Sequence, residues 1–104
     1  MIYLDNAATS IISDEVINDI TWCLKNVQGN PSSIHSEGYK AKKVLEESRK
    51  KVADFIGAES DEIIFCSSGS EANNLAIRGY LNSHNICECI LTTEIEHPSV
   101  LNTC

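Results

Sequence analysis

Positive charge is scarce in this sequence. Its 104 residues include 8 Lys and Arg against 15 Asp and Glu, which gives a net charge of −7. Nucleic acids and anionic membranes both attract proteins through basic surface. The acidic residues are dispersed along the chain, a pattern typical of solvated faces rather than of an interaction tail. The charge balance therefore argues against nucleic acid and against a membrane as the main partner.

Long apolar runs are also missing. No stretch reaches the roughly 18 to 20 continuous apolar residues of a membrane helix. The first ten residues, MIYLDNAATS, lack the basic region and apolar core of a secretion signal. The five cysteines are therefore expected to be free thiols in a reducing compartment rather than a disulfide framework. We predict a cytoplasmic protein.

Four segments have the spacing and end signals of helices. The first begins after Ser13, whose hydroxyl is suited to an N-cap, and Gly29 is expected to stop it. The second spans residues 36–56, with Gly57 as its C-terminal stop. The third covers about residues 71–81, and the fourth begins at Pro98, a residue favoured in a first helical turn.

Two short segments are rich in apolar and β-branched residues and read as strands, EIIFC at 62–66 and CILTT at 89–93. Strands that alternate with helices predict an α/β fold with a partly parallel sheet. Ligands in such folds bind at the carboxyl ends of the strands. Residues 67–70 and 94–97 follow the two strands, so we expect them to share one site if the strands are neighbours.

The first of these places is a small-residue turn, Gly69-Ser70, that leads into a helix. Unpaired backbone N–H groups and the positive end of the helix dipole would together attract an anion, and Ser70 adds a hydroxyl donor. The pattern is neither a Walker loop nor GxGxxG. A plain tight turn with Ser70 as an N-cap explains the same residues equally well, and both interpretations stay open here.

His97 lies between the second strand and the last helix, beside the proposed anion site. A lone histidine in such a place is more often structural than functional, and the neighbouring site favours a functional role.

His84, Cys87 and Cys89 are a candidate cluster of metal-ligand residue types. Their H-x2-C-x-C spacing matches no common zinc ligand pair and offers no fourth ligand. Core thiols explain the cysteines better, so we predict no metal site.

Four ordered segments together resemble the N-terminal part of cysteine desulfurases, the NifS/IscS-like members of the class V aminotransferase family. They are YLDNAAT, GNPSSIHSEG, ADFIGAESDEIIFCSSGSEANNLAIRG and TTEIEHPSVLNTC. The resemblance implies a pyridoxal phosphate (PLP) enzyme of fold type I, like aspartate aminotransferase, with an α/β large domain and a homodimeric active site. It implies that residues 1–104 are the N-terminal part of one class V domain, with no complete second domain. Residues 1–35 would form a helix and loops near the active site, and residues 36–104 would begin the PLP-binding α/β domain.

The resemblance also assigns roles to residues. Gly69 and Ser70 match positions whose backbone and hydroxyl hold the PLP phosphate, and His97 matches the histidine that stacks on the pyridine ring and is a candidate for proton transfer. DNAAT and GNPSS match segments near the substrate entrance and the subunit interface. The implied reaction takes sulfur from L-cysteine, giving alanine and an enzyme persulfide. The resemblance implies that the sulfur is used for iron–sulfur cluster assembly or tRNA thiolation, through a scaffold or another sulfur-acceptor protein.

The sequence departs from the family pattern in two ways. Thr9-Ser10-Ile11 stands where the family usually reads Thr-Thr-Pro. No residue here matches the family's Schiff-base lysine, its persulfide cysteine, the arginine that binds the substrate carboxylate, or the aspartate that pairs the pyridine nitrogen. We therefore expect a fragment that is inactive on its own. A fragment of a selenocysteine lyase and a non-catalytic phosphate-binding or assembly module remain alternatives.

Overall fold

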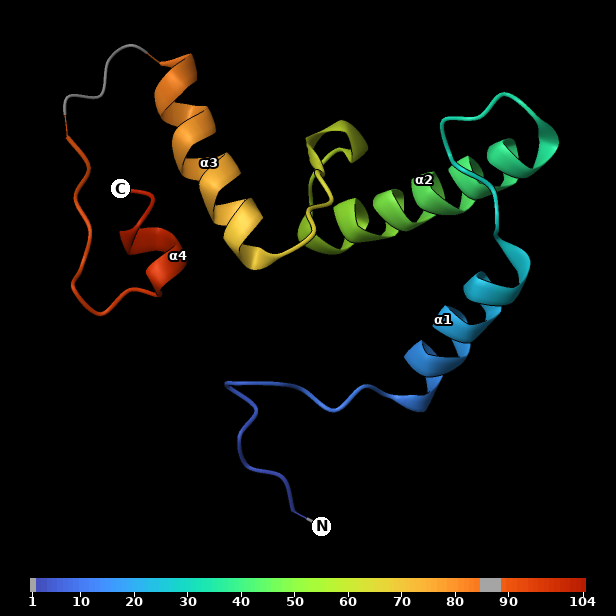
Figure 1. The fold of residues 1–104 in the computed structure, drawn as a ribbon, viewed down its shortest axis with the longest axis horizontal. Coiled ribbons are helices and arrows are strands. Elements are labelled where there is room, and N and C mark those ends of the chain that lie inside the picture. The colour runs from blue at the N-terminus through green and yellow to red at the C-terminus, as the bar shows by residue number, and fades with distance from the viewer. Residues whose placement is uncertain (1, 85–88) are drawn as a thin grey trace. The chain divides into compact units, whose positions relative to one another are not determined.

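The computed structural model describes residues 2–84 and 89–104, and all the regular elements among them are helical (Figure 1). In chain order these are α1 (Asp14–Asn26), α2 (Ser36–Ile56), the 3-10 helix η1 (Ser60–Glu62), α3 (Gly69–Ser83) and α4 (Pro98–Leu101). The chain divides into two compact units, Met1–Ile63 and Ile64–Cys104. Within the described residues no helix has the length and apolar character needed to cross a membrane.

Helix α1 begins where the sequence predicts. The Ser13 hydroxyl accepts a hydrogen bond from the Val16 N–H at 3.4 Å, and Asp14 and Glu15 lie in the first turn, near the positive end of the helix dipole. The helix ends at Asn26, before the predicted stop at Gly29.

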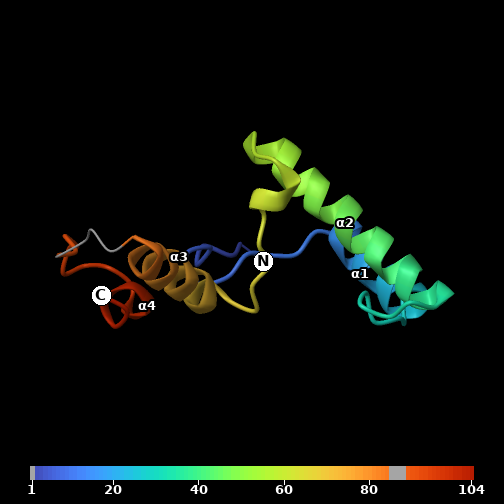
Figure 2. The same ribbon diagram turned by 90° about the horizontal axis from the view of Figure 1, so that it is seen from above.

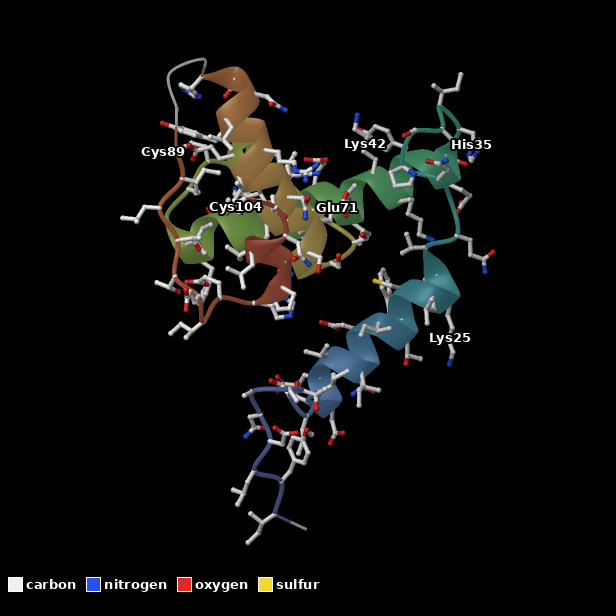
Figure 3. All side chains as sticks on the ribbon, turned by 60° about the vertical axis from the view of Figure 1, so that its left-hand side comes forward. Lys25, His35, Lys42, Glu71, Cys89 and Cys104 are labelled. Atoms are coloured by element: carbon white, nitrogen blue, oxygen red, sulfur yellow. The ribbon has the colours of Figure 1, made fainter. Side chains whose placement is uncertain are left out.

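Helix α2 has the predicted bounds, and each end has a local cause. Nδ1 of His35 accepts a hydrogen bond from the Gly38 N–H at 3.2 Å, so the imidazole serves as the N-cap (Figure 3). At the other end Gly57 adopts a left-handed conformation with φ of 72°, which glycine accepts at little cost. The Arg49 guanidinium, on the middle of α2, donates to the Ile63 carbonyl and so ties α2 to the chain after η1.

Neither predicted strand is present among the described residues, so this part of the prediction is wrong. Residues 62–66 begin inside η1 and continue as irregular chain, and residues 89–93 have no regular structure. Ile63 does have extended angles, φ −92° and ψ 121°, as its β propensity favours. A strand also needs a neighbour to accept and donate ladder hydrogen bonds, and propensity alone does not supply one. The α/β class is therefore not confirmed by this structure.

In the second unit, α3 and α4 lie side by side in both views (Figure 1, Figure 2). Helix α3 is longer than predicted, because it begins two residues before Glu71 and ends two residues after Leu81. Helix α4 begins at Pro98 as predicted. The buried Thr103 closes its end, since Oγ1 donates to the Ser99 carbonyl at 2.7 Å.

The apolar core of the described residues is small. Ala41 and Ala53 are the buried hydrophobic residues, whereas Phe55 is 90% exposed and Trp22 is 52% exposed. Exposed apolar surface on this scale is typical of a chain that packs against further protein.

Candidate active site

The N-terminus of α3 lies two residues earlier than the sequence indicated, and this changes which serine caps it. Ser68 is the N-cap: it has extended backbone, and its Oγ accepts a hydrogen bond from the Glu71 N–H at 3.2 Å. The alternative in which Ser70 is the cap is therefore wrong. Ser70 lies inside the first turn, so its hydroxyl is not used as the cap of the helix.

The Glu71 side chain, in the first turn of α3 (Figure 3), reaches back to Ser67, the residue before the N-cap. Its Oε2 accepts hydrogen bonds from the hydroxyl of Ser67 at 2.7 Å and from the backbone N–H of Ser67 at 2.6 Å. The hydroxyl bond, followed by the backbone bond, lowers the pKa of this carboxyl below its ordinary value of 4.5. The Glu71 carboxylate is therefore bonded to Ser67, outside the helix, and does not accept from the first N–H groups of α3.

Two backbone donors remain at this end of α3. Within the described residues, the N–H groups of Gly69 and Ser70 have no acceptor. The first N–H groups of a helix carry part of the positive end of its dipole, so an anion is the ligand they favour. A Cβ added at Gly69 would meet no atom within 4 Å, which leaves the approach to these donors open.

These donors line a hollow of about 370 Å³ in the second unit, and His97 lines it as well. The structure thus brings together the three residues that the sequence predicted for one site, Gly69, Ser70 and His97. It does so without a sheet, because the packing of α4 beside α3 places His97 there. The roles of the three residues stay predictions.

Two further residues line the hollow and were missed in the sequence, Asn73 and Ser99. Nδ2 of Asn73 donates to Oγ of Ser99 at 2.8 Å, and the same Oγ lies 2.8 Å from Nδ1 of His97. Asn73 follows Gly69 by four residues, which places both on one face of α3. That spacing was the available signal, whereas nothing in the sequence showed that Ser99 would face α3.

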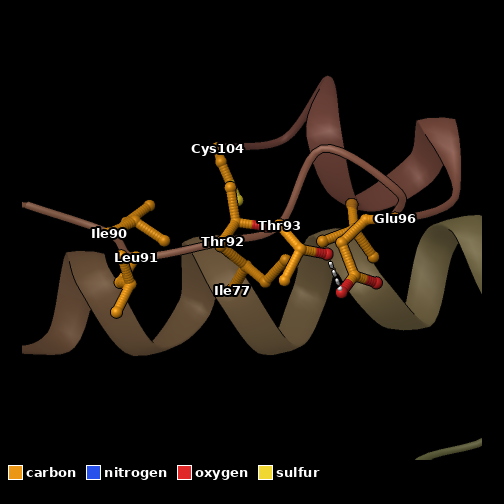
Figure 4. A pocket seen from close by; sticks show the side chains of 8 residues that line it. Ile77, Ile90, Leu91, Thr92, Thr93, Glu96 and Cys104 are labelled. Carbon is orange, nitrogen blue, oxygen red and sulfur yellow. Dashed lines mark hydrogen bonds between the residues drawn. The ribbon is translucent and has the colours of Figure 1, made fainter.

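A larger hollow of about 650 Å³ lies in the same unit (Figure 4). Apolar residues and two threonines line most of it, together with Glu96 and Cys104, and no lining residue is cationic. The Thr93 hydroxyl donates to Glu96 Oε1 at 2.9 Å, which fixes that carboxylate at the wall. A phosphate would meet a negative charge there and no helix N-terminus, so the smaller hollow is the better anion site.

The described residues contain no group of three or more His, Cys, Asp or Glu able to hold a metal ion. Of the candidate metal-ligand cluster of His84, Cys87 and Cys89, Cys87 lies outside the described residues. His84 instead stacks on Tyr80, with ring centroids 4.3 Å apart.

The Glu71 carboxylate makes the stability of α3 dependent on pH. Because the folded pKa is depressed, the stabilisation is complete above 4.5 and is lost as the pH falls through the lowered folded value. We expect amide exchange in the first turn of α3 to accelerate in that acid range, and Glu71→Gln to show fast exchange already at neutral pH. Glu94→Gln, an equal charge change on an exposed residue of the same unit, is the control. Equal exchange in the Glu71→Gln variant and in the parent chain at neutral pH would contradict the assignment.

The chain is similar to known proteins over its whole length. A family model described as Aminotransferase class-V matches residues 2–104. The chain is 43% identical to the cysteine desulfurase of Trichormus azollae over 104 residues, which is 100% of this chain and 26% of the relative. It is 47% identical to the putative cysteine desulfurase IscS 1 of Bacillus subtilis (strain 168), covering 99% of this chain and 27% of the relative. It is 45% identical to the cysteine desulfurase IscS of Dictyoglomus turgidum, covering 99% of this chain and 26% of the relative.

The chain therefore spans about a quarter of the length of the curated relatives it matches, and that quarter is N-terminal. The resemblance inferred from the four sequence segments is confirmed.

Proposed function

Because this chain belongs to the class V aminotransferase family, we propose that it supplies the phosphate-binding part of the active site of a PLP-dependent cysteine desulfurase of fold type I. The observation that carries the proposal is the shared hollow, where two acceptor-free N–H groups, a serine hydroxyl and an imidazole meet. The names of the relatives, which are cysteine desulfurases, support the choice of reaction.

The donor set fits a phosphate monoester. The N–H groups of Gly69 and Ser70 and the hydroxyl of Ser70 provide three donors at the positive end of a 15-residue helix. The hollow has the volume expected of a small-molecule site, roughly 300 to 1,000 Å³. When bound, PLP withdraws electrons from the substrate amino acid, a chemistry that protein side chains lack.

His97 fits the role of a planar partner beside the phosphate. Its Nδ1 accepts a hydrogen bond from the Ser99 N–H at 3.1 Å, so the neutral ring carries its proton on Nε2. A ring held in this tautomer can stack on the cofactor and present a proton at one defined atom.

The wider reaction follows the relatives. We propose L-cysteine as the substrate, with alanine and transferable sulfur as products, and an iron–sulfur scaffold or another sulfur acceptor as the partner. The exposed apolar surface of the described residues supports assembly with further protein, including a homodimer. The covalent lysine and the persulfide cysteine of the family match no residue of this sequence, so the remaining chemistry would come from protein outside it.

The proposal is tested in the full-length protein that contains this sequence. Purified protein loaded with PLP is given L-cysteine or L-selenocysteine with a reductant, and alanine and the released sulfide or selenide are measured. We expect equal amounts of alanine and sulfide from L-cysteine. Protein that retains no PLP, or that releases no alanine, would contradict the proposal, and a strict preference for L-selenocysteine would replace the substrate.

Ser70→Ala is expected to weaken PLP binding by about threefold to tenfold, because one hydroxyl donor to the phosphate is lost. Ser70→Thr keeps the hydroxyl and should keep the affinity. Both are measured by equilibrium titration of the apo-protein with PLP, followed by its absorption band. Equal affinity of Ser70→Ala and the parent protein would remove the hydroxyl from the phosphate site.

A further inference from the structure

A chain of hydrogen bonds runs from α3 to the imidazole in the site. Nδ2 of Asn73 donates to Oγ of Ser99 at 2.8 Å, and Oγ of Ser99 lies 2.8 Å from Nδ1 of His97. The backbone N–H of Ser99 donates to the same Nδ1 at 3.1 Å. Asn73 and Ser99 are both half-buried.

The direction of this chain follows from what each atom is able to donate. A backbone N–H only donates, so Nδ1 of His97 accepts and carries no proton. The hydroxyl of Ser99 has a single hydrogen, and the amide of Asn73 already donates to its oxygen. That hydrogen is therefore left for Nδ1 of His97, so the side-chain donors run from Asn73 through Ser99 to the ring.

We propose that Asn73, acting through Ser99, is a positioning residue that directs the Ser99 hydroxyl at Nδ1 and so fixes the orientation of His97. The inference rests on the proposed PLP site and names a residue to which that proposal assigns no role. Its effect is to keep two donors on Nδ1, so that the ring is held at one edge.

The same chain sets the spacing of the site. Asn73 lies four residues after Gly69, about 6 Å farther along the axis of the same helix. The phosphate donors and the anchor of the imidazole are therefore parts of one rigid element. Thr103 holds the other side of Ser99, since its hydroxyl donates to the Ser99 carbonyl at 2.7 Å. A shift of α3 would move the phosphate donors and the imidazole together and preserve their separation.

Asn73→Asp tests the proposal, because it has nearly the same shape and opposite hydrogen-bonding character. A carboxylate only accepts, so it would take the hydrogen of the Ser99 hydroxyl and leave the Ser99 oxygen as an acceptor facing His97. We expect Nδ1 of His97 to lose the hydroxyl donor and to keep the backbone N–H of Ser99. The measurement is 15N NMR of histidine-labelled full-length apo-protein, in which the Nδ1 signal should stay of the unprotonated type and shift downfield, because one of its two donors is lost. Asn82→Asp, an equal charge change on the exposed side of α3, should leave the signal where it is.

Kinetics of the PLP-loaded protein give the second readout. We expect Asn73→Asp to lower kcat for L-cysteine by roughly tenfold, because a small misplacement of a reacting group is costly, and to leave KM within about twofold. Ser99→Ala removes the connection, so adding Asn73→Asp to it should have little further effect on kcat. Additive losses in the double variant, or an Nδ1 signal unchanged in Asn73→Asp, would overturn the proposal. Failure of the parent protein to bind PLP would instead remove the proposed function and leave the NMR result on the apo-protein standing.

Discussion

Replacing Gly69 by proline is expected to weaken PLP binding about tenfold to a hundredfold while leaving α3 intact. Proline removes one backbone N–H, and a hydrogen bond from that group to a phosphate is charge-assisted and among the stronger kinds. Gly69 is the first residue of α3, a position that proline favours because its fixed φ suits the helix. The N–H that would be lost has no acceptor within the described residues, so no hydrogen bond of the folded chain breaks.

The backbone before Gly69 is also compatible with a proline ring at this position. The preceding residue, Ser68, has φ of −160° and ψ of 163°, the extended conformation that a residue before proline prefers. A Cβ at Gly69 meets nothing within 4 Å. Gly69→Ala is the matched control, because it adds the same first carbon and keeps the N–H.

The measurement pairs PLP titration with helix content by circular dichroism. We expect parent and Gly69→Ala protein to bind PLP alike, and Gly69→Pro to bind it more weakly at unchanged helix content. If Gly69→Pro and Gly69→Ala bound PLP equally, the N–H of Gly69 would not contact the phosphate. If both bound it weakly, crowding at this position, rather than the lost donor, would explain the effect.

Helix ends were the most predictable part of this fold. Ser13 caps α1, Gly57 ends α2, and Pro98 begins α4, each as the sequence indicated. These signals act over one turn of chain, so they can be read without knowing the tertiary structure. The start of α3 was misplaced by two residues because Ser67, Ser68 and Ser70 are all plausible caps. The contacts of Glu71 with Ser67 and Ser68 decide among them.

The strands were not predictable in the same way, because pairing is not local. EIIFC has the composition of a strand, yet Ile64 is 66% exposed and Ile63 offers its carbonyl to Arg49. Leu91, in the second predicted strand, is 99% exposed. The residues proposed for the PLP site were singled out by the small-residue turn and by their places after the two expected strands, and the four family-like segments then gave them their expected roles. Asn73 and Ser99 were missed because their contact joins residues 26 positions apart.

Gly38 ends the segment GNPSSIHSEG, in which a loop leads into α2, and Gly38→Ala is expected to cause a marked loss of stability. Gly38 is buried in the first turn of α2, and its φ is not positive, so space rather than backbone conformation requires glycine. A Cβ there would collide with the Ser33 carbonyl oxygen, and would lie 2.7 Å from the Ser33 Cβ and 2.8 Å from the Asn30 carbonyl oxygen. Two of these three atoms are backbone, and the Asn30 oxygen also accepts the Ser33 N–H at 2.9 Å, so the loop has little freedom to yield.

Two effects of the added methyl oppose each other, and their sizes decide the sign. Alanine favours a helix over glycine by about 0.8 to 1.0 kcal/mol, whereas overpacking of this kind typically costs 1 to 3 kcal/mol, roughly, and more where backbone must move. We expect a net loss of about 1 to 2 kcal/mol in the free energy of unfolding, measured by urea denaturation of the full-length protein. Gly79→Ala in α3 is the matched control, because its Cβ would meet only Leu75 Cδ1, at 3.9 Å. That variant should gain about 0.5 to 1 kcal/mol from helix propensity alone. A Gly38→Ala protein as stable as the Gly79→Ala protein would mean that the loop does not pack against α2 as closely as described.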